Sequence, residues 1–287
     1  MSLNNFIPTI WSARLLVNLY NDHVYGQAGV VNRDYEGEIQ NLGDTVKIQA
    51  IGPVTISDYT KNTNLQDPQA LDDSSMILTI EKSKSFNFAI DDVDKAQGNV
   101  NVMDGAMREA AYALGEVSDQ YLAGMYTQVS ANNTIGSDNS PVVPTANTAG
   151  SSAYEYLVDL GTLLTQSNVP KQGRWCIVPP WFHGLLQKDD RFVKQVTPVG
   201  TDVLLNGQVG RAAGFNILES NNVPNTNGAK YKIMAGHPMA ISFAEQINKV
   251  EAYRPEKRFA DAMKGLHLFG GKVVRPQGFA VLTASKS

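Results

Sequence analysis

Two stretches in the first third of the chain alternate apolar and polar residues, and their combined length constrains the fold most strongly. Apolar side chains occupy even positions between Val46 and Ile56, and again between Met76 and Ile90 with an interruption at Lys82 and Lys84. Alternation with a period of two places these side chains on one face of a β-strand. Paired as a hairpin, the two strands predict an arm on the order of 50 Å long, from about 30 residues that rise about 3.3 Å each.

The residues between these stretches, 57–75, are rich in Asp, Asn and Thr, which is typical of turns and loops. A two-stranded ribbon on its own is only marginally stable in water. The predicted arm is also too long to bury its apolar face inside one globule of 287 residues. The pattern therefore predicts that the arm needs a partner outside its own chain.

A second extended element follows, because the apolar period changes to that of a helix between 101 and 130. About 28 residues at 1.5 Å each predict a rod about 40 Å long, well above the mean helix length. Asn101 and Asp104 resemble a capping arrangement at its start. The predicted apolar stripe consists of Met103, Met107, Ala110, Leu114, Val117, Tyr121, Met125 and Val129.

The middle of the chain, from about 150 to 243, has the pattern of a compact mixed α/β body. Ser152 and Glu155 form a capping box that opens a helix ending near 168. The apolar run 175–178 predicts a buried strand, and Pro180 opens a short helix. The helix after Ser152 is expected to bury Ala153, Leu157, Leu160 and Leu164, and further strands are expected at 215–218, 231–235, 239–243, 249–254, 266–275 and 279–282.

Composition excludes several classes of function. Charged residues make up 18% of the chain and the net charge is −4, which disfavours a protein that grips nucleic acid phosphates. No stretch approaches 18 consecutive apolar residues, so no membrane-spanning helix is expected. The single cysteine, Cys176, has no partner in the chain for a disulfide and lies in an apolar run typical of an inert thiol.

The search for chemistry predicts no catalytic, cofactor-binding or metal-binding residues. The glycines between Gly207 and Gly214 have the wrong spacing for a dinucleotide fingerprint, and the acidic residues at 91–94 lack the spacing of a calcium loop. An α/β enzyme with its site in 150–243 remains an alternative. In that alternative His183, Asp189 or His237 would carry the chemistry.

The order of these elements resembles the major capsid proteins of tailed phages, which have the Hong Kong 97-type fold. The likeness covers nearly the whole chain, and it depends on the order of several short motifs. These are FIPTIWSARLL at 6–16, VNRDYEGE at 31–38, GDTVKI at 43–48, IDDVDKAQ at 90–97, NVP at 168–170, RWCIVP at 174–179, GFNI at 214–217 and SNNVP at 220–224. An encapsulin-like shell protein of the same fold is an alternative.

The resemblance implies an α+β fold and a non-enzymatic subunit of an icosahedral shell. It divides the chain into an N-terminal arm at 1–32, an extended hairpin loop at 33–98, a peripheral domain with the long spine helix at 99–149 and 244–287, and an axial domain at 150–243. The residues expected to make assembly contacts lie on the arm, at the hairpin tip and in a basic cluster near the C-terminus. They are Trp11, Arg14, Leu15, Asp58, Tyr59, Lys61, Asp67, Arg254, Lys257 and Arg258.

The same resemblance implies the partners. The chain is expected to pack with itself as hexamers and pentamers, in a virion whose subunits are made in the cytoplasm of a host bacterium. Because no long region precedes the arm, a separate scaffolding protein is expected during assembly, together with a portal. A cement or decoration protein is a further candidate. The shell is expected to enclose double-stranded DNA without sequence-specific binding, with no membrane and no cofactor.

Overall fold

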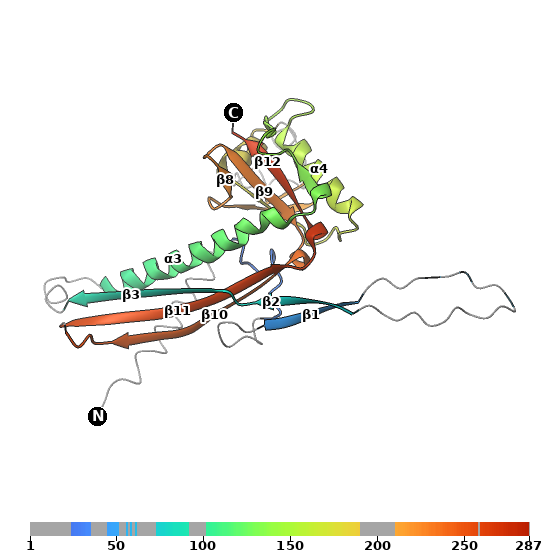
Figure 1. Ribbon diagram of the computed structural model, residues 1–287. Helices are drawn as coiled ribbons and strands as arrows, with labels where there is room; N and C mark the ends of the chain where they lie inside the picture. The colour runs from blue at the N-terminus through green and yellow to red at the C-terminus, as the bar shows by residue number, and fades with distance from the viewer. Residues whose placement is uncertain are drawn as a thin grey trace, which may run out of the picture.

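A three-stranded sheet, a seven-stranded sheet and a two-stranded ribbon organise the described part of the chain (Figure 1). The structure is a computed structural model that describes residues 24–35, 45–51, 56, 58, 61, 73–91, 102–189, 210–257 and 259–286. The predicted N-terminal helix around Trp11, the Asn101 cap and the glycine-rich bend at 207–209 lie outside the described residues. None of the helices in the described ranges is long and apolar enough to cross a membrane.

The first sheet is antiparallel and has the strand order β10-β11-β3. It is formed by β3 (Lys82–Asp91), β10 (Ile241–Tyr253) and β11 (Ala260–Val273), and helix α3 (Val102–Ala123) runs along one of its faces (Figure 1). The alternation predicted for β3 is confirmed at Phe86 and Phe88, which pack under the helix. Their buried neighbours are Met107, Ala111, Leu114, Val250 and Met263.

Helix α3 is shorter than the predicted rod of about 28 residues. It has 22 residues, and a 3-10 helix, η3 (Gly124–Gln128), continues its path. Gly124 marks the change, because glycine is among the poorest helix formers. The buried positions Ala111, Ser118 and Leu122 also differ by one position from the predicted Ala110, Val117 and Tyr121.

A two-stranded ribbon lies against the other face of this sheet. Strand β1 (Thr45–Ile51) pairs antiparallel with β2 (Asp73–Thr79), so the predicted hairpin is confirmed for these residues. The base of the ribbon is buried against Ala244 of β10 and Leu268 of β11. Close contact is possible because Gly270 has no side chain: a Cβ there would lie 2.5 Å from the carbonyl oxygen of Thr79.

Two expectations about the arm are therefore wrong. Residues 76–90 do not form one strand of the hairpin, because the chain leaves the ribbon after β2 and β3 pairs with β11. The apolar face at the base of the ribbon also has a partner within its own chain: Val46, Ile48, Leu78 and Ile80 are buried. Alternation reveals that a strand has one buried face, but it does not identify the surface that covers that face.

The second sheet has seven strands in the order β4-β12-β9-β5-β7-β6, with β8 paired to β9. Its strands are β4 (Thr134–Ile135), β5 (Trp175–Val178), β6 (Arg211–Ala212), β7 (Phe215–Glu219), β8 (Asn225–Thr226), β9 (Lys230–Gly236) and β12 (Phe279–Ser285). Helices α4 (Ala153–Gln166) and α5 (Pro180–Gln187) pack against it. The capping box of α4 and its four predicted buried residues are confirmed.

Strand β12 belongs to this second sheet, where it pairs with β9 and β4. The expectation that all of 244–287 accompanies the long helix is therefore wrong for residues 279–285. The chain between Phe279 and Ala284 is buried throughout, as expected for a strand with neighbours on both sides and covered faces. The predicted strand at 239–243 also differs: a 3-10 turn, η5 (Pro238–Ala240), precedes β10.

Candidate assembly surfaces

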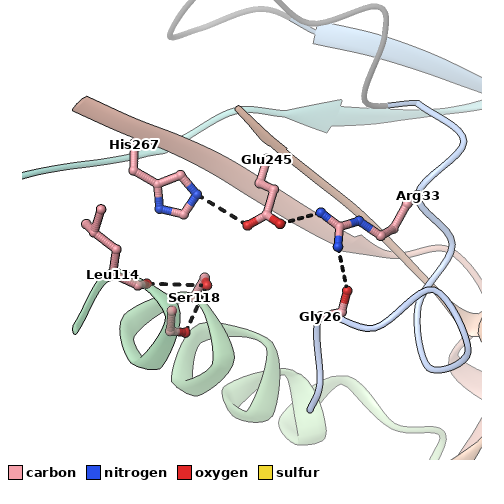
Figure 2. A network of polar contacts seen from close by, with 7 residues as sticks. Gly26, Arg33, Leu114, Ser118, Glu245 and His267 are labelled. Carbon is pink, nitrogen blue, oxygen red and sulfur yellow. Dashed lines mark hydrogen bonds and ion pairs between the residues drawn. The ribbon is translucent and has the colours of Figure 1, made fainter. Parts of the chain in front are cut away.

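A largely buried polar network fixes the N-terminal segment 24–35 to the three-stranded sheet (Figure 2). The Arg33 guanidinium forms an ion pair with Glu245 of β10 and donates a second hydrogen bond to the carbonyl of Gly26 at 2.9 Å. Glu245 also lies 3.3 Å from Nε2 of His267, a fully buried residue of β11. Burial from water strengthens such contacts, so the network ties the segment to two neighbouring strands.

A buried carboxylate on α3 holds the start of the same segment. Asp119 accepts hydrogen bonds from the backbone N–H groups of Val24 and Tyr25 at 3.1 and 2.7 Å, and from the side chain of Asn222 at 3.2 Å. Tyr25 fills the core beneath, and burial raises the pKa of its hydroxyl well above the ordinary value. Asp119 therefore joins three separate parts of the chain: the N-terminal segment, the long helix and the loop after β7.

The far end of the ribbon is exposed at each of its described positions. Asp58 and Lys61, both expected to make assembly contacts, are exposed, and Ile56 beside them is 94% exposed. Tyr59 and Asp67 lie outside the described residues, as do Trp11, Arg14 and Leu15 of the arm. Ile56 is therefore a large aliphatic side chain left open to water near two charged residues.

The turn between β10 and β11 carries the second predicted cluster. Arg254 pairs with Asp261 at 3.0 Å and Lys257 is exposed, while Arg258 lies outside the described residues. Phe259, which the sequence reasoning missed, is 83% exposed in this turn. An aromatic residue beside three basic ones was the available signal, since aromatic and arginine side chains are enriched at interfaces.

Away from the ribbon, the face of the sheet opposite α3 is polar and open. Lys264 pairs with Glu251 at 3.0 Å and lies over the ring of Tyr253 at 5.3 Å. The Tyr253 hydroxyl in turn donates to Asn87 of β3 at 3.0 Å. This mixed-charge surface agrees with the predicted balance of charges near the C-terminus, and it does not form a continuous basic patch.

The three residues of the alternative enzyme make separate structural contacts. Nδ1 of His183 lies 2.6 Å from Glu219, Asp189 accepts from the hydroxyl of Ser152 at 2.9 Å, and His237 accepts from the N–H of Met239 at 3.3 Å. Desolvation lowers the pKa of His237. Burial raises the pKa of the Cys176 thiol, as expected for an inert cysteine. The described ranges hold no group of three metal-ligating side chains.

These features define a class of protein: an elongated α+β subunit with exposed side chains at the end of the ribbon and at the β10–β11 turn of the three-stranded sheet. Comparison with known proteins agrees. The family model described as "Phage capsid protein" matches residues 74–282. The chain belongs to this family, and it is a structural major capsid protein of the tailed-phage type with the Hong Kong 97-type fold.

Solved structures cover almost the whole chain. The chain is 30% identical to a protein of Mycobacterium phage Che8, with 98% of each chain covered and a TM-score of 0.70. A capsid structure of the cyanophage P-SCSP1u matches with 20% identity, 87% of this chain, 85% of that chain and a TM-score of 0.69. No curated protein gives a significant match.

An encapsulin complex from Synechococcus elongatus matches at 12% identity, over 86% of this chain and 84% of that chain, with a TM-score of 0.56. At that identity the likeness shows the fold alone. The encapsulin-like alternative is therefore less well supported than the phage capsid protein.

Proposed function

We propose that this capsid protein builds its shell from hexamers and pentamers, in which the exposed end of the ribbon contacts a neighbouring subunit. The observation that carries the proposal is the contrast along the ribbon. Its base is buried in its own subunit at Val46 and Leu78, whereas Ile56 at its far end is 94% exposed. A fixed base holds the exposed end in a defined direction, which reduces the entropy lost when it binds.

The β10–β11 turn is a second contact, through Lys257 and Phe259, at the end of the sheet opposite the ribbon (Figure 1). The remaining assembly contacts assigned to Trp11, Arg14, Leu15, Tyr59, Asp67 and Arg258 stay part of this proposal, as does Arg254. The arm at 1–32, the hairpin at 33–98 and the axial domain at 150–243 are the proposed units. Residues 279–285 join the axial unit, and the rest of 99–149 and 244–287 forms the peripheral unit.

The proposal extends to partners. A scaffolding protein and a portal take part in assembly, a cement protein is a further candidate, and the shell encloses double-stranded DNA. A net charge of −4 supports enclosure without tight binding, because a strongly basic lining would hold phosphates in place. Synthesis takes place in the cytoplasm of the host bacterium. No catalytic activity is proposed for any part of the chain.

The test is removal of the ribbon's end. Replacing 58–72 with a short Gly-Ser linker should leave a folded subunit that fails to form shells. Substitution Ile56→Ser should weaken assembly as well, whereas Ile77→Ser, at a half-exposed position on the paired part of the ribbon, serves as the matched control. Shells of normal yield and shape from the linker variant would refute the role of the ribbon between subunits.

A further inference from the structure

Three segments around the seven-stranded sheet enclose a hollow on the surface of the subunit. They are the second half of α4, the loop 170–174 between α4 and β5, and the turn between β6 and β7. The helix approaches the turn closely because Gly161 has no side chain: a Cβ there would lie 3.4 Å from the ring of Phe215. The hollow has a volume of about 600 Å³ and is lined by Val158, Gly161, Thr162, Thr165, Gln166, Lys171, Arg174, Ala213 and Gly214.

The lining of this hollow carries positive charge without a matching negative charge. It includes the side chains of Lys171 and Arg174, and no carboxylate is among the described residues that line it. The imbalance is local, because acidic residues outnumber basic ones in the whole chain by 28 to 24. Two cations that share one concave surface give it a positive potential, which raises the local concentration of anions.

The guanidinium of Arg174 is buried beneath the hollow and satisfies its hydrogen bonds with neutral groups. It donates to the carbonyls of Val169 and Pro170 at 2.7 and 2.8 Å. It also donates to the carbonyl of Gly161 at 3.0 Å and to the hydroxyl of Thr165 at 3.2 Å. Arg174 is 6% exposed, and no carboxylate of the described ranges forms an ion pair with it. The partial negative charge at the end of α4 offsets only part of its full charge.

An anion from outside the subunit would stabilise this buried charge. Desolvation lowers the pKa of the Arg174 guanidinium, and no acidic neighbour opposes that effect. Charged side chains that are buried in proteins are normally paired with an opposite charge. An anion in the hollow would attract the guanidinium through a medium less polar than bulk water, where the attraction between charges is stronger.

Hydrogen-bond donors that could hold such an anion lie on the open side of the hollow. Lys171 is exposed, and its ammonium has no partner among the residues that the structure describes. The same is true of the side-chain amide of Gln166. The donors of Arg174 are already used, so this residue contributes charge and no direct bond. Oxyanions accept several hydrogen bonds at once, and those from a charged donor are the stronger kind.

We propose that this hollow is a binding site for an oxyanion, held by the Lys171 ammonium and the Gln166 amide in the electric field of Arg174. Carboxylate and phosphate groups both belong to this class of ligand. The site is separate from the proposed assembly contacts on the ribbon and at the β10–β11 turn. Because it lies within one subunit, its occupancy can be measured before any shell forms.

Isothermal titration calorimetry of the purified, unassembled subunit at low ionic strength tests the site with two probes. The first is inorganic phosphate, a free ion. The second is an end-capped triglutamate peptide, with end-capped triglutamine as its uncharged control. The parent should bind an anionic probe and not the control, with an affinity that falls as salt is added. Tighter binding of triglutamate would support a carboxylate-bearing protein segment as the source of the anion, and tighter binding of phosphate would support a free ion. Binding of neither probe would overturn the proposal.

Substitutions in the lining decide whether the anion occupies this hollow. Lys171→Gln should weaken binding about tenfold, because it removes a charged hydrogen-bond donor. Lys188→Gln is the matched control, since it removes the same charge from an exposed lysine that does not line the hollow. Gln166→Glu keeps both cations and should also weaken binding, because the new carboxylate pairs with them and repels the probe. Circular dichroism checks that each variant is folded. Equal affinities of Lys171→Gln and Lys188→Gln, or of Gln166→Glu and the parent, would overturn the proposal.

Discussion

Removing the Asp119 carboxylate should detach the N-terminal segment from the long helix. Asp119 is 1% exposed and accepts three hydrogen bonds from Val24, Tyr25 and Asn222. Hydrogen bonds to a charged group contribute about 1.5–3 kcal/mol each, but not additively, and a buried donor left without a partner adds a desolvation cost. We therefore expect Asp119→Ala to lower the free energy of unfolding by about 3–5 kcal/mol.

The conservative variant separates loss of charge from loss of the acceptors. Asp119→Asn keeps one oxygen for the two backbone N–H groups, and the side chain of Asn222 can turn its own oxygen toward the new amide. The expected loss is about 1–2 kcal/mol, close to that of a single hydrogen bond. The ratio of the two losses thus reports how much of the stability depends on the acceptors themselves.

The assay is urea unfolding of the subunit purified before assembly. The urea concentration at the midpoint of unfolding is compared between variants that have the same m-value, the slope of the unfolding free energy against urea concentration. A loss of about 3–5 kcal/mol corresponds to a fall in unfolding temperature on the order of 10 °C for a chain of this size. Limited proteolysis should also cut the Asp119→Ala variant within 24–35 faster than the parent. An Asp119→Ala subunit within about 1 kcal/mol of the parent would refute the reasoning, because buried acceptors of this kind cost more than that to remove.

Further predictions concern close packing and acid stability. Gly270→Ala should destabilise the subunit by about 2–3 kcal/mol, because the new Cβ meets backbone of β2 that cannot yield. Gly184→Ala, whose Cβ meets nothing within 4 Å, is the control and should be neutral or stabilising; equal losses in both would show that the ribbon is not packed as described. The hydrogen bond and charge of Lys232 lower the pKa of Asp138 below its ordinary 3.8, so this carboxylate stabilises the fold above that pH and loses its effect as pH falls through the lowered pKa. Asp138→Asn should therefore lose less stability than the parent on acidification below about pH 4, measured by unfolding at several pH values, and identical acid profiles would contradict the pairing.

Local features of the fold were predictable where neighbours in sequence determine the structure. The capping box at Ser152 and the spacing of Leu157, Leu160 and Leu164 identified helix α4 and its buried face, and the apolar run 175–178 identified a buried strand. Each of these signals acts within one or two helical turns or a single strand. Capping and amphipathic burial are local enough to be read from the order of residues alone.

The partners of strands were less predictable, because they depend on contacts between distant residues. Apolar residues keep to even positions from Met76 to Ile80 and from Phe86 to Ile90, yet the chain leaves β1 after Thr79 and pairs with β11 from Lys82 onward. Period and phase are the same on both sides, and Lys82 and Lys84, which interrupt the apolar positions, are the only mark of the change in the pattern. The apolar sequence of the C-terminal strand β12 likewise indicates that the strand is buried, but it does not indicate in which sheet the strand lies.

Some residues of the candidate assembly surfaces could be predicted from the sequence, and others could not. Exposure of Asp58, Lys61 and Lys257 followed from polar composition, and Phe259 could have been found from its basic neighbours. The network of Arg33, Glu245 and His267 could not be predicted, because Arg33 and Glu245 are separated by 212 residues. Single charged residues spaced so far apart carry no periodic pattern that connects them.

Electron microscopy of the purified assembled protein tests the central claim most directly. We expect closed icosahedral shells in which hexamers and pentamers are resolved and the ribbon of each subunit, including Ile56, contacts a neighbour. A monodisperse, compact monomer under all assembly conditions, with or without a scaffold, would contradict it. So would shells in which the end of the ribbon projects into solvent and contacts no other subunit.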